Sequence, residues 1–306
     1  MQPQSLHAGN SLTVGHLVAL ITILIWGTTF ISTKVLLTSF SPVEILLFRF
    51  VMAYAALWLF CPRRLKNVTL NQELVFMGAG LTGICLYYLL ENIALTLTMA
   101  SNVGVLITMS PFFTAILTHL CLKDQEPLRA NFFVGFVLAI GGIALISFNG
   151  AKFELNPAGD ILALTAAFVW ACYAVLTRKM ADFGFGTIAC TRRTFFWGIV
   201  FMLPTPWLFE FRLGLERLMD PVNIANLLFL GLGASAMCFA TWNYAVKVLG
   251  TVKTSIYIYL IPVVTILTAI VFLGEPITWM SVSGCAMTIA GLVISEWGHR
   301  LFGLRR

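Results

Sequence analysis

Arg49 and Glu91 are charged residues that stand inside long apolar stretches of this 306-residue chain. If these stretches cross a membrane, as argued below, each charge costs about 2.5–3.5 kcal/mol and requires a partner or a water-filled cavity. We therefore expect the two side chains to face one cavity, where Arg49 holds a carboxylate and Glu91 holds an amine or exchanges a proton. The alternative is a buried ion pair that only fixes two helices.

Five uncharged residues belong to the same candidate binding site. Asn92 directly follows Glu91 in the sequence. Trp26 and Trp170 each lie in the middle of an apolar stretch, and because a buried indole N–H needs an acceptor, we interpret the pair as cavity walls or gates. Asn102 belongs to a predicted helix start that could meet a substrate anion. Tyr257 could line the same space, with packing in the core or against lipid as the alternative.

Two prolines, Pro111 and Pro262, lie about halfway along apolar stretches in the two halves of the chain. Proline removes a backbone donor and bends a helix, and the carbonyls it frees must face protein or a wet cavity. Interrupted helices at matching positions are a pointer to a binding site in transporters with internal repeats. We interpret both prolines as gating hinges, with a simple packing kink as the alternative.

Several chemistries are absent from the sequence. It has no G-x-x-x-x-G-K-[ST] loop, so ATP is not expected to power the protein directly. Its four histidines are far apart and its seven cysteines contain no C-x-x-C pair, so neither a metal site nor another cofactor is expected. The net charge of +6 is spread over short links without a continuous basic face, which excludes a nucleic-acid partner.

The composition indicates a polytopic helical membrane protein. Hydrophobic residues make up 59% of the chain and charged residues 10%, whereas soluble domains average about 25% charged residues. A stretch of roughly 20 apolar residues crosses the hydrocarbon core of a bilayer. The predicted spans are 16–36, 42–60, 73–95, 101–121, 130–148, 159–178, 186–207, 224–245, 254–273 and 277–297. The predicted fold class is therefore an all-α integral membrane protein with ten transmembrane helices.

The placement of lysine and arginine predicts the orientation of these spans. With the N-terminus in the cytoplasm, the inner links and the C-terminal tail hold twelve of these residues and the outer links hold four. Cytoplasmic loops of membrane proteins carry the excess of positive charge. Both termini are therefore predicted to be cytoplasmic.

The two halves of the chain carry matching residues in the same order. A shift of 144 residues aligns Trp26 with Trp170, and a shift of 151 aligns Pro111 with Pro262. A duplicated unit of five helices must enter the membrane from opposite sides, which produces an inverted repeat with a pseudo-two-fold axis in the membrane plane. The predicted repeats span residues 16–148 and 159–297. Such symmetry favours a transporter whose midplane site is exposed to each side in turn.

A family resemblance rests on motifs distributed over nearly the whole chain. They are the run 26–30, Ser41-Pro42 with Arg49-Phe50, Glu91-Asn92 with Ala100-Ser101-Asn102, Pro111, and the Glu-Pro pairs at 126–127 and 275–276. On these residues the chain resembles the EamA family of the drug/metabolite transporter superfamily. The resemblance implies ten helices in two EamA repeats and secondary transport, commonly export, of metabolites such as amino acids. Small multidrug exporters of this superfamily use a carboxylate in their first helix, which span 16–36 lacks.

The predicted function is secondary transport that exports small metabolites, such as amino acids, across the plasma membrane (the inner membrane of a bacterium) by alternating access. Coupling to protons is left open. The expected partners are a small-molecule substrate and the lipid bilayer, and a complete inverted repeat is compatible with a functional monomer. An exporter of drugs or other amphipathic solutes is the alternative within transport. A non-transporting membrane helper and a lipid-active enzyme are the alternatives outside it, although no cluster of acids or histidines favours an enzyme.

Overall fold

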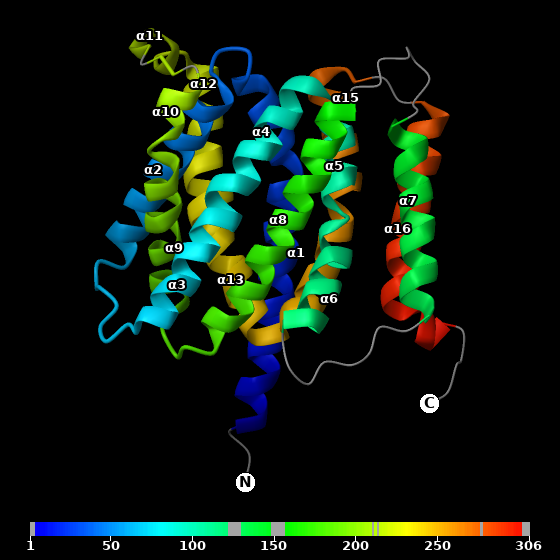
Figure 1. Cartoon of the computed structure of the whole chain (residues 1–306), viewed down its shortest axis with the longest axis horizontal. Helices are drawn as coiled ribbons and strands as arrows, with labels where there is room; N and C mark the ends of the chain where they lie inside the picture. The colour runs from blue at the N-terminus through cyan, green and yellow to red at the C-terminus, as the bar shows by residue number, and fades with distance from the viewer. Residues whose placement is uncertain are drawn as a thin grey trace.

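A computed structural model of the chain describes residues 4–121, 130–147, 157–209, 211–212, 214–275 and 278–301. All regular structure within these residues is helical (Figure 1). Within these described residues, six helical stretches are long and apolar enough to cross a membrane: Leu12–Leu36, Pro42–Phe60, Leu70–Leu97, Ala100–Cys121, Pro157–Ala181 and Pro221–Leu249. The predicted all-helical membrane architecture is thus confirmed, whereas the count of ten crossings stays a prediction.

The helical elements follow one another closely along the chain. Their bounds are α1 (Gln4–Leu36), α2 (Pro42–Phe60), α3 (Leu70–Ala79), η1 (Gly80–Leu86), α4 (Tyr87–Leu97), α5 (Ala100–Ile107), α6 (Ser110–Cys121), α7 (Ala130–Ser147), α8 (Pro157–Ala181), α9 (Thr187–Met202), α10 (Thr205–Leu208), α11 (Leu215–Leu218), α12 (Pro221–Leu228), η2 (Phe229–Met237), α13 (Cys238–Leu249), α14 (Thr251–Ser255), η3 (Ile256–Leu260), α15 (Ile261–Leu273) and α16 (Trp279–Leu301).

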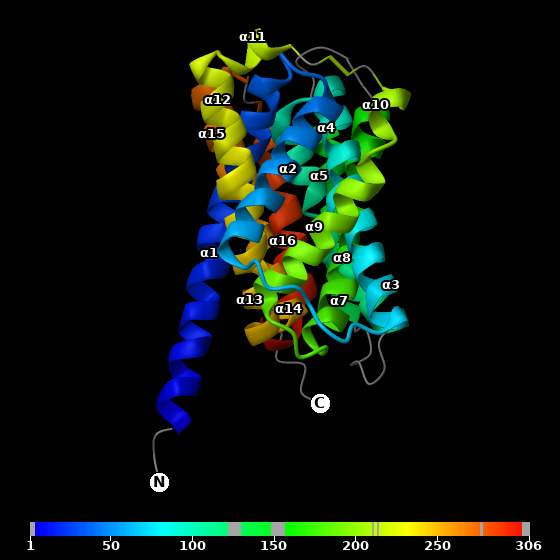
Figure 2. The same ribbon diagram turned by 90° about the vertical axis from the view of Figure 1, so that its left-hand side faces the viewer.

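The long helices run side by side as a bundle, with α4 against α8 and α1 against α13 and α15. The start of α1 and the end of α16 lie at the same end of the bundle in both views (Figures 1 and 2). We call this the terminal end; α2 and α12 begin at the other, the far end. Helices α7 and α16 pack mainly against each other. Their contact is so close that a Cβ atom added at Gly142 would lie 2.5 Å from the carbonyl oxygen of Gly284.

Two π-helical segments interrupt the bundle at corresponding places in the two halves. The element η1 joins α3 to α4, and η2 joins α12 to α13. π-helical turns are rare and occur frequently at functional sites. The backbone also comes very close to a neighbouring helix here, because a Cβ atom added at Gly80 would lie 2.6 Å from the amide nitrogen of Gly198. The sequence analysis predicted the spans 73–95 and 224–245 here, and Gly80 and Gly231, which align under the shift of 151 residues, lie in the two π-helical segments.

Both candidate hinge prolines stand at breaks between helical segments. Helix α5 ends at Ile107, and α6 begins at Ser110, so the buried Pro111 lies in the first turn of a new helix. In the second half, the 3₁₀ segment η3 precedes α15, and Pro262 occupies the first turn of α15. A missing N–H is tolerated in a first turn because that donor has no intrahelical partner. A gating role for either proline remains a prediction.

Candidate functional site

A small cavity of about 20 Å³ lies among α1, α4, α6, α8 and the junction of η3 with α15. Its lining residues are Trp26, Thr29, Phe30, Tyr87, Tyr88, Glu91, Ile107, Ser110, Trp170, Ile258 and Ile261. A space of this size holds about one water molecule, whereas sites for small organic ligands measure about 300–1,000 Å³. This central cavity is therefore too small, as it stands, to hold a small organic ligand.

Trp26 organises an aromatic cluster on one wall of the central cavity. Its ring centroid lies 5.3 Å from Trp170, 5.1 Å from Trp242 and 5.5 Å from Phe239. Its indole N–H donates to the carbonyl oxygen of Ala234 at 2.8 Å. Ala234 lies in η2, so a π-helical segment supplies the acceptor that a buried indole requires. The predicted pair Trp26 and Trp170 thus meets edge to face from α1 and α8.

Arg49 is 1% exposed and lies behind the cavity wall. Its Nε donates to the Ser235 hydroxyl at 2.6 Å, and its Nη2 donates to the Tyr88 hydroxyl at 3.3 Å. The guanidinium carbon also stands 4.2 Å from the centre of the Tyr88 ring, an attraction that strengthens when it is removed from water. Its Nη1 has no hydrogen-bond partner among the described residues. One nitrogen of a buried cation is therefore left without an acceptor among the described residues.

Glu91 lines the central cavity directly and is 1% exposed. Its Oε1 has no hydrogen-bond partner among the described residues, and Tyr87, one turn earlier on the same helix, lies against its carboxylate. No ion pair joins Glu91 to Arg49 within the described structure. The direct pairing considered from the sequence is therefore not formed, because Arg49 is directed to Ser235 and Tyr88 instead.

Three other predicted site residues bind elsewhere. The Asn92 side chain donates to the Pro42 carbonyl at 3.0 Å and so fastens α4 to the start of α2. Asn102 donates to the Thr98 hydroxyl at 3.2 Å, within the turn that precedes α5. The hydroxyl of Tyr257 lies 2.8 Å from Nδ1 of His16. None of the three residues lines the central cavity.

Tyr87, Tyr88 and Ser110 line the central cavity but were missed by the sequence analysis. The two tyrosines could have been predicted from helical spacing, because positions three and four residues before Glu91 lie on the same face of a helix as Glu91. Ser110 directly precedes Pro111, and its hydroxyl is buried with no partner among the described residues. It adds a second unpartnered polar atom to the cavity wall.

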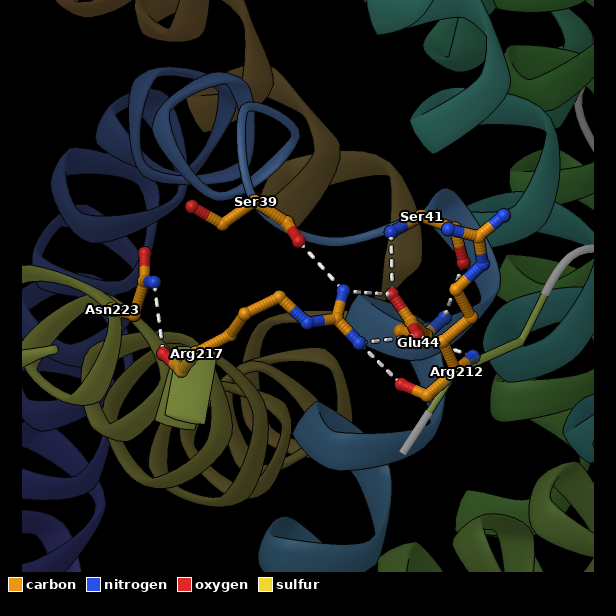
Figure 3. A network of polar contacts seen from close by, with 6 residues as sticks. All are labelled: Ser39, Ser41, Glu44, Arg212, Arg217 and Asn223. Atoms are coloured by element: carbon orange, nitrogen blue, oxygen red, sulfur yellow. Dashed lines mark hydrogen bonds and ion pairs between the residues drawn. The ribbon is translucent and has the colours of Figure 1, made fainter. Parts of the chain in front are cut away.

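A second polar cluster lies at the far end around the buried Glu44, whose carboxylate is paired with Arg217 (Figure 3). Glu44 receives two hydrogen bonds of 3.0 Å from the guanidinium of Arg217, and it also accepts from the backbone N–H groups of Ser41 and Arg212. Arg217 further donates to the Ser39 carbonyl at 2.7 Å. The hydrogen bonds to Glu44 raise the pKa of the Arg217 guanidinium. This cluster fastens the link before α12 onto the start of α2, away from the central cavity.

A third group of polar contacts, also at the far end, joins the two halves of the chain. The Glu275 carboxylate accepts from the hydroxyl of Ser101 at 2.6 Å and from its backbone N–H at 3.2 Å, at the start of α5. Nearby, Lys34 Nζ donates to the carbonyl oxygens of Leu95 and Thr98, the second at 2.8 Å. An acid at a helix start and a cation at a helix end both complement the helix dipole. We call this arrangement the far-end latch.

Arg178, the counterpart of Lys34 in the second half, has a different partner among the described residues. Arg178 aligns with Lys34 under the shift of 144 residues. It pairs instead with Asp182, one turn later on the same helix, at 3.0 Å, and both side chains are largely exposed. The two ends of the bundle therefore differ in the engagement of equivalent cations.

The sequence profile of the EamA-like transporter family matches residues 13–148 and 157–297. The chain belongs to this family. An uncharacterized transporter of Archaeoglobus fulgidus is 29% identical to it, and the match covers 92% of this chain and 96% of the relative. A probable terminal-alkyne amino-acid exporter of Streptantibioticus cattleyicolor is 27% identical, with 94% of each chain covered. A probable amino-acid metabolite efflux pump of Salmonella typhimurium is 26% identical, with 92% and 95% covered.

A solved crystal structure shares the fold of this EamA transporter, with a TM-score of 0.66, 19% identity, and 94% and 97% of the two chains covered. The family and its named members are transporters and efflux pumps rather than enzymes. Together with the six apolar helices, this makes the chain a multi-pass integral protein of the plasma membrane. The resemblance inferred from the motifs is confirmed.

Proposed function

We propose that this EamA transporter exports small metabolites, with amino acids as the first candidates, by alternating access. One observation carries the proposal: Glu91 presents to a small, aromatic-walled cavity a carboxylate oxygen that has no partner among the described residues. A buried charge of this kind inside a membrane bundle marks a substrate or ion pathway. The names of the relatives from Streptantibioticus and Salmonella support amino acids as the substrate class.

In the proposed mechanism, Glu91 binds the substrate amine or a coupling proton, and Arg49 binds the substrate carboxylate. Arg49 lies behind Tyr88, so the cavity must expand and the Tyr88 ring must turn before Nη1 can reach a ligand. Trp26 and Trp170 form the apolar wall against the rest of the substrate. Expansion past Pro111 and Pro262 would open the cavity to one end of the bundle at a time.

The proposed topology has ten crossings in two inverted repeats, 16–148 and 159–297, with both termini in the cytoplasm. The excess of lysine and arginine in the links at that side supports it. The position of the start of α1 and the end of α16 at one end of the bundle is also in keeping with an even number of crossings. The terminal end is then the cytoplasmic end, and one chain contains a complete site.

The test is uptake of labelled amino acids into proteoliposomes, with and without a pH gradient. Saturable uptake that Arg49→Ala abolishes supports a carrier with Arg49 in its site. Glu91→Gln is expected to keep substrate binding and lose the acceleration by the gradient, because an amide cannot carry a proton. An unchanged response to the gradient in Glu91→Gln would rule out coupling through this residue.

A second candidate substrate class is favoured by the cavity wall. Trp26, Trp170, Tyr87 and Tyr88 surround a single acid, and aromatic faces attract organic cations. The same proteoliposomes distinguish the two classes. Uptake of a lipophilic cation without uptake of any amino acid would replace the first proposal with drug export.

A further inference from the structure

A hollow of about 790 Å³ lies at the terminal end, between the end of α2, the start of α3 and α9. Its lining includes Tyr54, Trp58, Arg64, Glu73 and Arg193. It is separate from the central cavity, with which it shares no lining residue. We call it the terminal-end pocket. Its volume is within the range of sites that hold small organic groups.

The terminal-end pocket carries more positive than negative charge. Three arginines, Arg64, Arg192 and Arg193, line it together with one acid, Glu73. Arg193 pairs with Glu73 at 2.6 Å, which leaves Arg64 without a carboxylate partner among the described residues. The Arg192 guanidinium donates to the Arg63 carbonyl at 2.6 Å, so the chain that forms the rim is held in place by a buried cation. Three cations against one acid leave a net charge of +2, which favours an anionic occupant.

The position of the pocket and its aromatic residues favour a lipid headgroup as the anion. Tyr54 and Trp58 line it beside the arginines, and Trp58 is 50% exposed. Aromatic residues of this kind collect at the level of the lipid headgroups. Phe60 and Leu70, at the adjoining helix ends, are 83% and 76% exposed. A phospholipid whose phosphate lies in the pocket can therefore place its acyl chains along these exposed apolar side chains.

The far end offers a contrast within the same molecule. There the cation that meets a buried acid comes from the chain itself, because Arg217 binds Glu44 (Figure 3). In the terminal-end pocket three arginines meet one acid, and Arg64 has no carboxylate partner among the described residues. We propose that the terminal-end pocket binds the phosphate headgroup of an anionic phospholipid, with Arg64 and Arg193 as its phosphate ligands. Basic pockets between transmembrane helices bind such headgroups in other membrane proteins.

The experiment is native mass spectrometry of the full chain, released from micelles that contain phosphatidylglycerol or phosphatidylcholine. The wild-type protein is expected to retain phosphatidylglycerol in preference to phosphatidylcholine. Arg64→Gln is expected to lower retention of phosphatidylglycerol about fivefold, the contribution of one basic residue near an anionic lipid surface. The double variant Arg193→Gln with Glu73→Gln removes both members of an ion pair, and it is expected to lower retention because Arg193 is one of the two proposed phosphate ligands.

Arg178→Gln is the matched control, because it removes an arginine from the same end but outside the pocket. Its retention of phosphatidylglycerol is expected to equal that of the wild type, and an equal loss in Arg178→Gln and Arg64→Gln would overturn the pocket in favour of general surface charge. Displacement of the lipid by inorganic phosphate would overturn the lipid as the occupant. Unchanged retention in Arg64→Gln and in the double variant would overturn the site itself. Thermal unfolding of each variant verifies that it is folded.

Discussion

Arg49 is the largest of the fully buried side chains in the described part of the molecule. Its contacts use the planar shape of the guanidinium, because Nε binds Ser235 while the plane stands over the ring of Tyr88. A lysine in this place would keep the charge and lose both geometric features. Shape as well as charge therefore determines what residue 49 can do.

Arg49→Lys is expected to lower the rate of transport about tenfold, the effect of one lost hydrogen bond to a charged group. Initial uptake rates in proteoliposomes measure the change. The control is Arg178→Lys, since Arg178 lies in an exposed pair with Asp182, and its rate is expected to match the wild type. A rate for Arg49→Lys equal to the wild type would show that charge alone is sufficient at this position.

At the scale of the elements, a specific side-chain contact holds the end of α4 in the far-end latch. Lys34 binds two carbonyl oxygens at the end of α4, which have no intrahelical partners. Lys34→Met is expected to lower the free energy of unfolding by about 2 kcal/mol, because it leaves these acceptors without a donor. Thermal or denaturant unfolding in detergent measures the loss.

Arg178→Met tests the same substitution at the equivalent place in the other half. Its partner Asp182 is 64% exposed, and an exposed pair of this kind contributes about 0–1 kcal/mol. A much smaller loss than in Lys34→Met is therefore expected. Equal losses in the two variants would mean that the two ends of the bundle are held equally, against the contrast in their contacts.

The helices and one pair of site residues could be predicted from the sequence. The length of the apolar stretches predicted the helices, and the internal repeat predicted equivalent positions for Trp26 and Trp170, because both signals lie in local composition and spacing. The hydrogen bonds of Arg49 to Tyr88 and Ser235 could not be predicted, because they depend on how α4 and η2 are rotated against α2. For the same reason Glu275 gave no sign of its contact with α5, a contact across 174 residues of chain.

At the scale of the whole molecule, close packing of α7 against α16 depends on glycine. Gly142→Ala is expected to lower the free energy of unfolding by roughly 1–3 kcal/mol, because its Cβ would lie 2.5 Å from the Gly284 carbonyl oxygen. Gly233→Ala is the control, since the nearest atom to its Cβ would be 3.8 Å away, on Phe229. A smaller loss in Gly142→Ala than in Gly233→Ala would contradict tight packing of the pair.

The far-end latch also allows a test of alternating access. Joining Ser101→Cys to Glu275→Cys with a short, reducible cross-linker is expected to stop transport, because one end of the bundle can then no longer open. Reduction is expected to restore it, and either single variant with the same reagent is the control. A cysteine-depleted background is required, since Cys121 is exposed. Full transport by the cross-linked protein would contradict opening at this end.

The pairing of α7 with α16 has a consequence for biosynthesis. Domains generally fold in the order in which they are made, beginning at the N-terminus. Yet α7 ends at Ser147, and α16, the element that covers its glycine face, is the last described helix of the chain. The glycine face of α7 therefore lacks its partner until α16 has been made, so the first half cannot complete its packing before the second half is synthesised.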